Sequence, residues 1–148
     1  MEIAILGCGC FWGPEIKFSK LNGVVKTEVG YCGGKSQNTS YEEVCTGKTN
    51  HAEVVKIEFN NKVITYEKIL EYFFEIHDPT TLNQQGPDMG TQYRSEIFFC
   101  NKEQQEIAQK ILNKFNNKYN GKITTKISEI KNYTCAEEYH QKYLEKEI

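Results

Sequence analysis

The chain opens with the apolar run Ile3–Leu6 (IAIL), which leads directly into residues 7–10 (GCGC) and then to Pro14. A short run without polar residues is typical of a central strand that is buried on both faces. Proline is favoured at the first position of a helix, and Glu15 behind it suits the positive end of the helix dipole. We therefore expect a strand, a tight glycine turn and a helix, with Cys10 at the junction.

The rest of the chain alternates between strand-like and helix-like patterns. Apolar or β-branched residues occupy every second position in two segments, and polar caps precede two amphipathic segments. We expect strands at 3–6, 25–31, 55–59, 95–100 and, more weakly, 122–130, and helices at 14–20, after Thr65, after Asn101 and in the tail from about Ala136. This alternation favours a mixed sheet with helices packed on it. Residues 77–93 lack periodicity, and an irregular segment of that length is usually functional or disordered.

Length and composition narrow the class of protein. A chain of 148 residues suits one domain, spanning 1–148, with one hydrophobic core. The net charge of −2 offers no broad basic surface for nucleic acid. Neither a signal peptide nor a membrane-spanning run is evident, so we expect a soluble cytoplasmic protein, as a monomer rather than an oligomer. Stable disulfides are then not expected among the six cysteines, which leaves redox chemistry, metal ligation or burial.

Cys10 is the first candidate for chemistry. Unpaired backbone N–H groups at a helix start favour an anion, so this placement should lower the pKa of the thiol and promote the reactive thiolate. Phe11 and Trp12 follow at once, and two large rings beside a thiol could wall a small apolar pocket. The alternative is that Cys10 is a small buried hydrophobe and both rings belong to the core.

Glu53 is the second candidate because of its register. It is in phase with Val55, Ile57 and Phe59, the apolar face of the expected strand. If the strand extends back that far, Glu53 points inward, and apolar surroundings raise the pKa of a carboxyl so that it can act as a general acid. The alternative is that the strand starts at Val54 and Glu53 is solvated.

Four further polar residues have weaker signals. Tyr41 and Tyr93 can each offer a hydroxyl to a polarised oxygen, although single tyrosines are usually packing residues. Asp88 lies among turn-forming residues, where an Asx-turn is the simpler explanation. Arg94, the only arginine, is expected to hold a carboxylate in a structural role.

Two other classes of function stay open at this level. A cysteine–histidine thiol hydrolase would need His51 or His140 to fold against Cys10. A metal-binding module would use the three histidines with four of the cysteines, but their spacing does not match a structural zinc site. These residues are His51, His77, His140, Cys8, Cys10, Cys32 and Cys45.

These segments together resemble the A-type peptide methionine sulfoxide reductases over nearly the whole chain. The matching motifs are 9–13 (GCFWG), 30–34 (GYCGG), 41–53 (YEEVCTGKTNHAE), 77–81 (HDPTT), 85–90 (QGPDMG), 92–95 (QYRS) and 136–141 (AEEYHQ). The resemblance implies an α+β fold, a two-layer plait of ferredoxin-like character with a mixed sheet and long active-site loops.

The resemblance also implies a reaction. Cys10 would attack the sulfur of methionine sulfoxide, free or within an oxidised protein, while Glu53 protonates the oxygen. Methionine would leave and Cys10 would become a sulfenic acid. One enzyme serves each sulfoxide epimer, and the family resembled here takes the S epimer. The implied role is repair of proteins after oxidative stress.

The other site residues receive roles from the same resemblance. Tyr41 and Tyr93 would hold the sulfoxide oxygen by hydrogen bonds, and Asp88 would fix the substrate and nearby water. Phe11 and Trp12 would enclose the methyl group of the substrate. Neither a metal nor a cofactor is implied. The electron donor would be an external thiol such as thioredoxin, glutaredoxin with glutathione, or dithiothreitol.

The sequence departs from many family members in its cysteines. Those members carry resolving cysteines in a C-terminal tail, whereas the last cysteine here is Cys135. We hypothesise that no internal cysteine resolves the sulfenic acid efficiently; the candidates are Cys8, Cys32, Cys45, Cys100 and Cys135. Cys8 is too close to Cys10 for an unstrained bridge, and Cys45 is expected to be a packing residue.

Two further points concern single positions. Some family members have selenocysteine in place of Cys10. Asn50 replaces the glycine that is more usual before His51.

Overall fold

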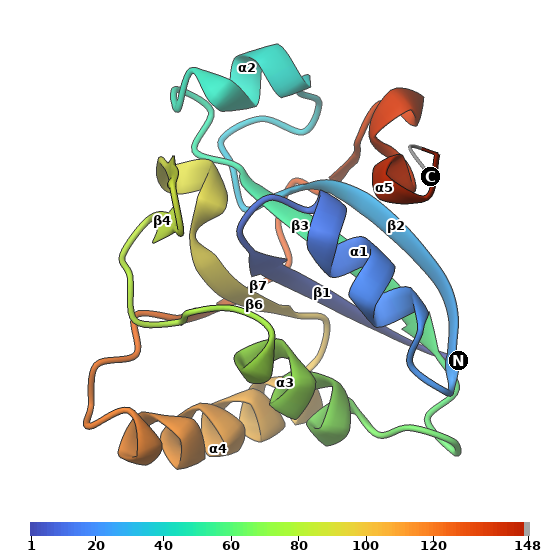
Figure 1. Cartoon of the computed structure of the whole chain (residues 1–148), viewed down its shortest axis with the longest axis vertical. Helices are drawn as coiled ribbons and strands as arrows, with labels where there is room; N and C mark the ends of the chain where they lie inside the picture. Colours follow the sequence, from blue (N-terminus) through green and yellow to red (C-terminus); the bar gives the residue numbers. More distant parts are fainter. Residues whose placement is uncertain (147–148) are drawn as a thin grey trace.

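The computed structural model describes residues 1–146, which are built around one six-stranded mixed sheet (Figure 1). The strands lie in the order β7-β6-β1-β3-β2-β8, and all neighbours are antiparallel except the parallel pair β6–β7. The strands are β1 (Glu2–Cys8), β2 (Val24–Cys32), β3 (Ala52–Phe59), β6 (Ser95–Phe99), β7 (Lys126–Glu129) and β8 (Thr134–Cys135). A separate hairpin joins β4 (Gln84–Gln85) to β5 (Asp88–Met89).

Residues 1–146 also form five α-helices and two 3-10 turns, of which η2 and α5 follow the last strand. They are α1 (Trp12–Ser19), α2 (Tyr41–Cys45), α3 (Tyr66–Glu75), α4 (Lys102–Lys118) and α5 (Tyr143–Lys146), with η1 (Thr91–Tyr93) and η2 (Glu138–His140). The elements β1, α1, β2, β3, α3 and β6 follow the β-α-β-β-α-β order of a ferredoxin-like plait, with β3 between β1 and β2. The fold class expected from the sequence is therefore confirmed.

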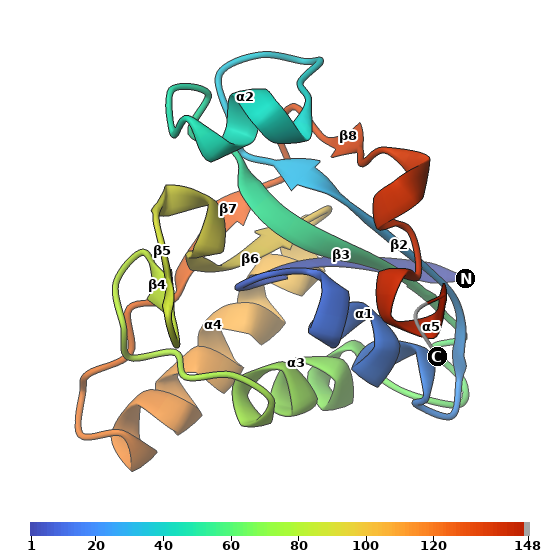
Figure 2. The same ribbon diagram turned by 45° about the horizontal axis from the view of Figure 1, so that its top comes forward.

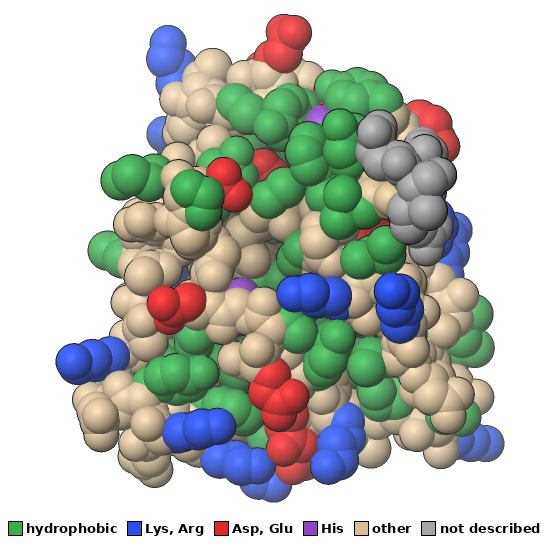
Figure 3. Space-filling view, in the orientation of Figure 1, with side chains coloured by type: hydrophobic (Ala, Val, Ile, Leu, Met, Phe, Trp, Pro, Cys, Tyr) green, Lys and Arg blue, Asp and Glu red, His purple; other side chains and the backbone are tan. Residues whose placement is uncertain are grey.

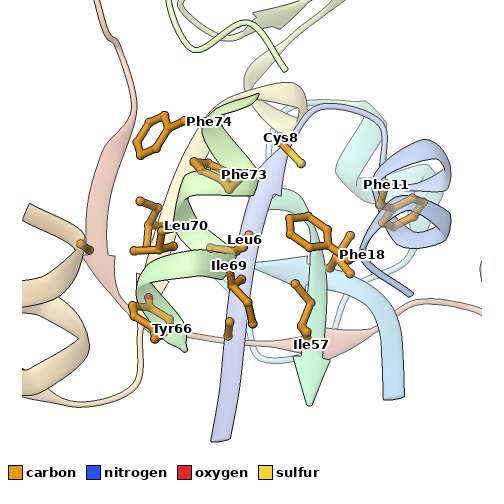
Figure 4. Close-up of a cluster of buried hydrophobic side chains, with 14 of the residues drawn as sticks. Leu6, Cys8, Phe11, Phe18, Ile57, Tyr66, Ile69, Leu70, Phe73 and Phe74 are labelled. Atoms are coloured by element: carbon orange, nitrogen blue, oxygen red, sulfur yellow. The ribbon is translucent and has the colours of Figure 1, made fainter. Parts of the chain in front are cut away.

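The main core lies between the sheet and the helices α1, α3 and α4. Every second residue of β1, including Leu6 and Cys8, points to this side, where Phe18 of α1 and Phe73 and Phe74 of α3 are fully buried (Figure 4). The turned view shows these helices on one side of the sheet (Figure 2). Burial of these aromatic rings supplies much of the hydrophobic stabilisation of the fold.

A smaller apolar cluster covers the opposite face of the sheet. It contains Ile5, Cys32, Val54 and Phe98, with the ring of Tyr133 packed against it. β1 is thus buried on both faces from its third residue onward, which is why its sequence reads as an unbroken apolar run.

The helix caps predicted from the sequence are confirmed. The Thr65 side chain accepts a hydrogen bond from the Lys68 N–H at 3.1 Å, and the Asn101 side chain accepts one from the Gln104 N–H at 2.9 Å. The first helix begins at Trp12, two residues before Pro14, and its N-cap residue makes no side-chain hydrogen bond.

Several local expectations were wrong. The apolar alternation expected over 25–31 fails at its first residue, because a bulge between Val24 and Lys26 leaves Val25 58% exposed. The weak strand at 122–130 shortens to β7, and the helical tail from Ala136 reduces to η2 and α5, with residues 147–148 outside the described part. The segment 77–93 is partly ordered as the β4–β5 hairpin and η1, and α2 and β8 were not predicted.

Residues 1–146 contain no helix with the length and apolar character needed to cross a bilayer.

Candidate active site

Cys10 lies on a tight turn between β1 and α1. Gly9 has a φ of +96°, and a Cβ there would lie 2.7 Å from Cγ of Gln85 in β4, so only glycine fits. The Gln85 side chain is fixed by Asp78, whose N–H donates to Oε1 and whose carbonyl accepts from Nε2, each at 2.8 Å. The turn that carries Cys10 therefore rests on the β4–β5 hairpin.

Glu53 points inward from β3, as the register predicted. Its side chain is 1% exposed, it lies opposite Tyr31 in the β2–β3 pair, and its Oε1 accepts the Phe11 N–H at 3.3 Å. The second oxygen, Oε2, is buried and has no hydrogen-bond partner among residues 1–146. Buried polar atoms are rarely left unpaired. A protonated carboxyl could donate from Oε2 to a bound molecule, and this would account for the missing partner.

Burial keeps the Glu53 carboxyl neutral. Loss of solvation raises its pKa to about 8, with a smaller opposing effect from the Phe11 N–H and a further rise from the nearby Asp88 carboxylate. The acid form thus predominates at neutral pH, which is the state expected of a general acid.

The expectation of a lowered Cys10 pKa was wrong for the ligand-free protein. Burial raises the pKa of the thiol to about 11; the Trp12 N–H lowers it, while Glu53 and Asp88 raise it. One backbone donor at the start of α1 does not offset the loss of water around the sulfur. Both Cys10 and Glu53 are therefore protonated at rest.

The two candidate tyrosines lie within electrostatic reach of Glu53. Tyr41 begins α2 and donates its N–H to Glu137 Oε2 at 2.9 Å, while Oε1 of Glu137 accepts the Tyr31 hydroxyl at 2.7 Å. Burial, followed by the Glu53 charge, raises the pKa of Tyr93 to about 12, and burial also raises that of Tyr41. Both remain neutral phenols that can donate a hydrogen bond.

Asp88 and the two aromatic residues complete the predicted set. Asp88 is half-buried in β5, and its charge acts on Cys10, Glu53 and Tyr93, which brings these four residues into one site. Phe11 is 1% exposed and belongs to the core, while Trp12 is half-buried. On the face shown in Figure 3, hydrophobic side chains gather between the positions that α2 and α1 have in Figure 1.

Three residues near the site were not predicted to take part in it. Glu137 holds Tyr41, His140 accepts a hydrogen bond from the Trp12 indole, and Tyr143 stacks on the Trp12 ring. Glu137 and His140 lie in the matching motif at 136–141, and the sequence suggests His140 only as a partner for Cys10 or as a metal ligand. Tyr143 lies outside that motif and has no sequence signal.

Within residues 1–146, the hydrogen bonds of the three histidines go to groups other than the Cys10 thiol. His51 Nε2 bonds to the Ser36 carbonyl, His77 bonds to the Phe73 carbonyl and to Ser95, and Nδ1 of His140 accepts from Trp12. None of these described contacts forms the cysteine–histidine pair that a thiol hydrolase requires. Within 1–146, no three His, Cys, Asp or Glu side chains cluster as metal ligands.

The other cysteines differ in accessibility, and all six are free thiols. Cys8 and Cys32 are buried, whereas Cys45, Cys100 and Cys135 are exposed. The expectation that Cys45 packs in the core was wrong, because it ends the short surface helix α2.

Two other expectations can be compared with the structure. Arg94 donates from Nε to Glu96 Oε1 at 2.6 Å in a buried ion pair, which confirms its structural role. Asn50 has a φ of +58°, a left-handed conformation that glycine and asparagine adopt more easily than other residues.

Comparison with known proteins gives one consistent family. A family model described as peptide methionine sulfoxide reductase matches residues 2–148. "Peptide methionine sulfoxide reductase MsrA" of Pelagibacter ubique is 68% identical over 146 residues, covering 99% of each chain. The protein of that name from Methanothermobacter thermautotrophicus is 50% identical, covering 98% of this chain and 87% of the relative.

Solved structures agree with the sequence relatives. Reduced Mxr1 from Saccharomyces cerevisiae superposes with a TM-score of 0.94 at 44% identity, covering 98% of this chain and 84% of that one. Methionine sulfoxide reductase A of Corynebacterium diphtheriae also superposes with a TM-score of 0.94, at 38% identity, covering 98% of this chain and 74% of that one. The yeast protein in complex with Trx2 superposes with a TM-score of 0.69 at 30% identity, covering 96% of this chain and 84% of that one.

The raised pKa of Glu53 can be measured directly. In protein with 13C-labelled glutamate, we expect one side-chain carboxyl signal, absent from Glu53→Gln, to titrate near pH 8. In Asp88→Asn the same signal should titrate at lower pH, because a negative neighbour is removed. A Glu53 signal that titrates below pH 6 would contradict the assignment.

The same shift has a consequence for stability. A carboxyl whose pKa is higher in the folded than in the unfolded protein stabilises the fold, because the folded state binds its proton more tightly. This contribution is complete below the unfolded-state pKa of 4.5 and is lost as the pH rises towards the folded-state pKa of about 8. Between these pH values the wild type should therefore lose stability relative to Glu53→Gln in urea unfolding.

Proposed function

The chain belongs to the peptide methionine sulfoxide reductase family, and from this premise we propose that it reduces the S epimer of methionine sulfoxide to methionine. The substrate is the free amino acid or an oxidised residue in a protein, and thiols supply the electrons. The observation that supports this reaction most strongly is that Oε2 of Glu53 is buried and has no hydrogen-bond partner among the described residues, in a carboxyl whose pKa burial raises to about 8. A sulfoxide oxygen is the kind of acceptor that such an acid would serve.

The proposed reaction balances without any other reactant. The Cys10 sulfur attacks the sulfoxide sulfur while Glu53 gives its proton to the oxygen, and the thiol proton returns the carboxyl to its acid form. The attack forms a transient bond between the two sulfurs. As the oxygen passes to the Cys10 sulfur, its bond to the methionine sulfur and the bond between the two sulfurs both break, so methionine leaves and Cys10 becomes a sulfenic acid. The methionine sulfur gains two electrons and the Cys10 sulfur loses two.

Asp88, Tyr41 and Tyr93 would support this step. The Asp88 charge raises the pKa of both Cys10 and Glu53, so the two protons that the reaction uses are present at rest. The neutral phenols would donate to the sulfoxide oxygen, where negative charge develops as its bond to sulfur lengthens. Asp88 would also hold the substrate and nearby water. The half-buried Trp12 ring would enclose the methyl group, and the Phe11 ring, 1% exposed in the ligand-free protein, would form the back of that pocket.

An external thiol would restore Cys10. One thiol converts the sulfenic acid into a mixed disulfide with loss of water, and a second thiol releases Cys10 and leaves as a disulfide. The yeast relative forms a complex with Trx2, so a thioredoxin is the protein donor we propose, with glutaredoxin and glutathione or dithiothreitol able to replace it.

The positions of the other cysteines favour direct reduction by that thiol. Cys100 lies by the Ile3 carbonyl, at the opposite end of β1 from Cys10, about 15–20 Å away along a strand. Cys8 and Cys32 are buried, and Cys135 is on the edge strand beyond β2. Cys45, which lies beside Tyr41, is the remaining internal candidate.

We propose the cytoplasm as the site of action. Six free thiols suit a reducing compartment. The extent of the domain over 1–148 and the monomeric state stay predictions from the sequence.

The reaction is tested by turnover with dithiothreitol on each sulfoxide epimer separately. We expect wild type to reduce the S epimer, Cys10→Ser to be inactive, and Glu53→Gln to lose about 10²–10⁴-fold in kcat/KM because it cannot donate a proton. Cys100→Ser, an exposed cysteine far from the site, is the matched control and should keep wild-type activity. Turnover by Cys10→Ser, or an undiminished rate in Glu53→Gln, would refute the mechanism.

The source of the second thiol is tested by mass spectrometry after one turnover without reductant. We expect Cys10 to be trapped as the adduct of a sulfenic-acid reagent, with five free thiols remaining. A Cys10–Cys45 disulfide, abolished in Cys45→Ser, would show instead that the chain resolves its own sulfenic acid.

A further inference from the structure

The short helix α2 carries Tyr41, one of the two phenols proposed to hold the sulfoxide oxygen, and it lies outside the sheet. It has five residues and sits beyond the end at which β3 begins (Figure 2). Val44 attaches it to the main core, while Glu42 and Cys45 are exposed. So short a helix with so little buried surface does not fix its own position, so other contacts must place Tyr41.

The Glu137 carboxylate supplies such a contact. Its Oε2 accepts the Tyr41 N–H at 2.9 Å, and its Oε1 accepts the Tyr31 hydroxyl at 2.7 Å. One oxygen is thus engaged by α2 and the other by β2. Partial burial disfavours the ionised form, but these two donors outweigh it and hold the pKa of Glu137 below its usual value. The carboxylate is therefore charged at neutral pH, and hydrogen bonds to a charged acceptor are the stronger kind.

The second partner of Glu137 belongs to the strand pair that carries the acid. Tyr31 is fully buried and lies directly opposite Glu53 in the β2–β3 pair. Opposite residues of an antiparallel pair are neighbours on the same face of a sheet. The Tyr31 ring also packs against Phe11, whose N–H donates to Glu53, with the ring centroids 5.7 Å apart. A group that is fixed to Tyr31 is thus fixed relative to Glu53.

The main chain beside Glu137 is anchored as well. β8 pairs with residues 30–31 of β2, and the Ala136 N–H donates to the Val29 carbonyl at 3.0 Å. On the other side, the Glu137 carbonyl accepts the His140 N–H at 2.9 Å. The carboxylate therefore extends to α2 from a main chain that is held before and after it.

We propose that Glu137 is a positioning residue for the reduction: its carboxylate ties the start of α2 to the strands that carry Glu53, so that the Tyr41 hydroxyl meets the sulfoxide oxygen that Glu53 protonates. This inference rests on the proposed function for the roles of Tyr41 and Glu53. A displacement of about 1 Å in a group that serves the transition state can cost on the order of 100-fold in rate. A carboxylate that holds the main chain of Tyr41 prevents such a displacement.

The test compares variants of the full chain. Glu137→Ala removes both contacts of the carboxylate. Glu137→Gln can keep them, because its carbonyl can accept from the Tyr41 N–H while its NH2 group donates to the Tyr31 hydroxyl. Glu42→Ala removes an exposed carboxylate from α2 itself and is the matched control.

In Glu137→Ala we expect the first-turnover rate at saturating S epimer to fall about tenfold, with little change in the substrate concentration that gives half the maximal rate. The hydrogen bond from Tyr41 strengthens as charge develops on the oxygen, so the loss falls on the chemical step. Glu137→Gln should stay within about threefold of wild type, and Glu42→Ala should match wild type. In 15N-labelled protein the Tyr41 amide proton signal should move upfield in Glu137→Ala and much less in Glu137→Gln, which reports the contact independently of activity.

The Tyr41→Phe background separates positioning from a general structural effect. If Glu137 acts through the Tyr41 hydroxyl, Glu137→Ala should cost no further rate once that hydroxyl is removed. An equal loss from Glu137→Ala in the wild-type and Tyr41→Phe backgrounds would overturn the inference, as would a wild-type first-turnover rate in Glu137→Ala.

If Glu137→Ala does not fold, Glu137→Asp provides the same test. Its side chain keeps the charge but is one methylene too short to reach both partners where they now lie, so a wild-type rate would again overturn the inference. If the wild type itself does not reduce the sulfoxide, the proposed function fails and the inference falls with it. A wild type that reduces the sulfoxide no faster than Glu137→Ala refutes the positioning role alone.

Discussion

The hydrogen bond from the Phe11 N–H to Glu53 Oε1 joins the start of α1 to the start of β3, 42 residues apart. Because β1 and β3 are antiparallel neighbours, the chain leaves β1 at Cys8 beside the point where β3 begins, and a carboxyl at Glu53 meets the first turn of α1. One carboxyl oxygen is used to hold this junction. The other is buried and has no partner within residues 1–146, and it is this atom that the proposed chemistry needs.

The electrostatics of the site follow from the same burial. A carboxyl and a thiol removed from water both favour their neutral forms, and the Asp88 charge strengthens the preference. A resting site with a thiol and a carboxylic acid already holds the protons that a sulfoxide consumes. The reactive thiolate would then form only as the substrate oxygen takes the proton from Glu53, which limits unwanted oxidation of Cys10 between turnovers.

The sequence was most informative where one local pattern determines the structure. The apolar run at β1, the caps at Thr65 and Asn101 and the phase of Glu53 within β3 each depend on neighbouring residues, and the structure confirms them. The plait was expected only from the family resemblance, and the strand order was not predicted, since periodicity contains no information about which strands are neighbours.

Features that depend on tertiary contacts could not be predicted in this way. The outward turn of Val25 arises from a bulge set by pairing with β3, and the raised Cys10 pKa arises from burial by distant segments. The contact between Trp12 and His140 joins residues 128 apart and has no local signature. The roles of the site residues in catalysis stay proposals.

The pH dependence of the first turnover tests the central claim most directly. The rate of methionine formation from the S epimer, measured with excess reduced enzyme and subsaturating substrate, should be constant below about pH 8 and fall above it, as Glu53 loses its proton. In Glu53→Gln the rate should be low and should lack this decline. A wild-type rate that instead rises from pH 8 towards 11, following ionisation of Cys10, would contradict the account.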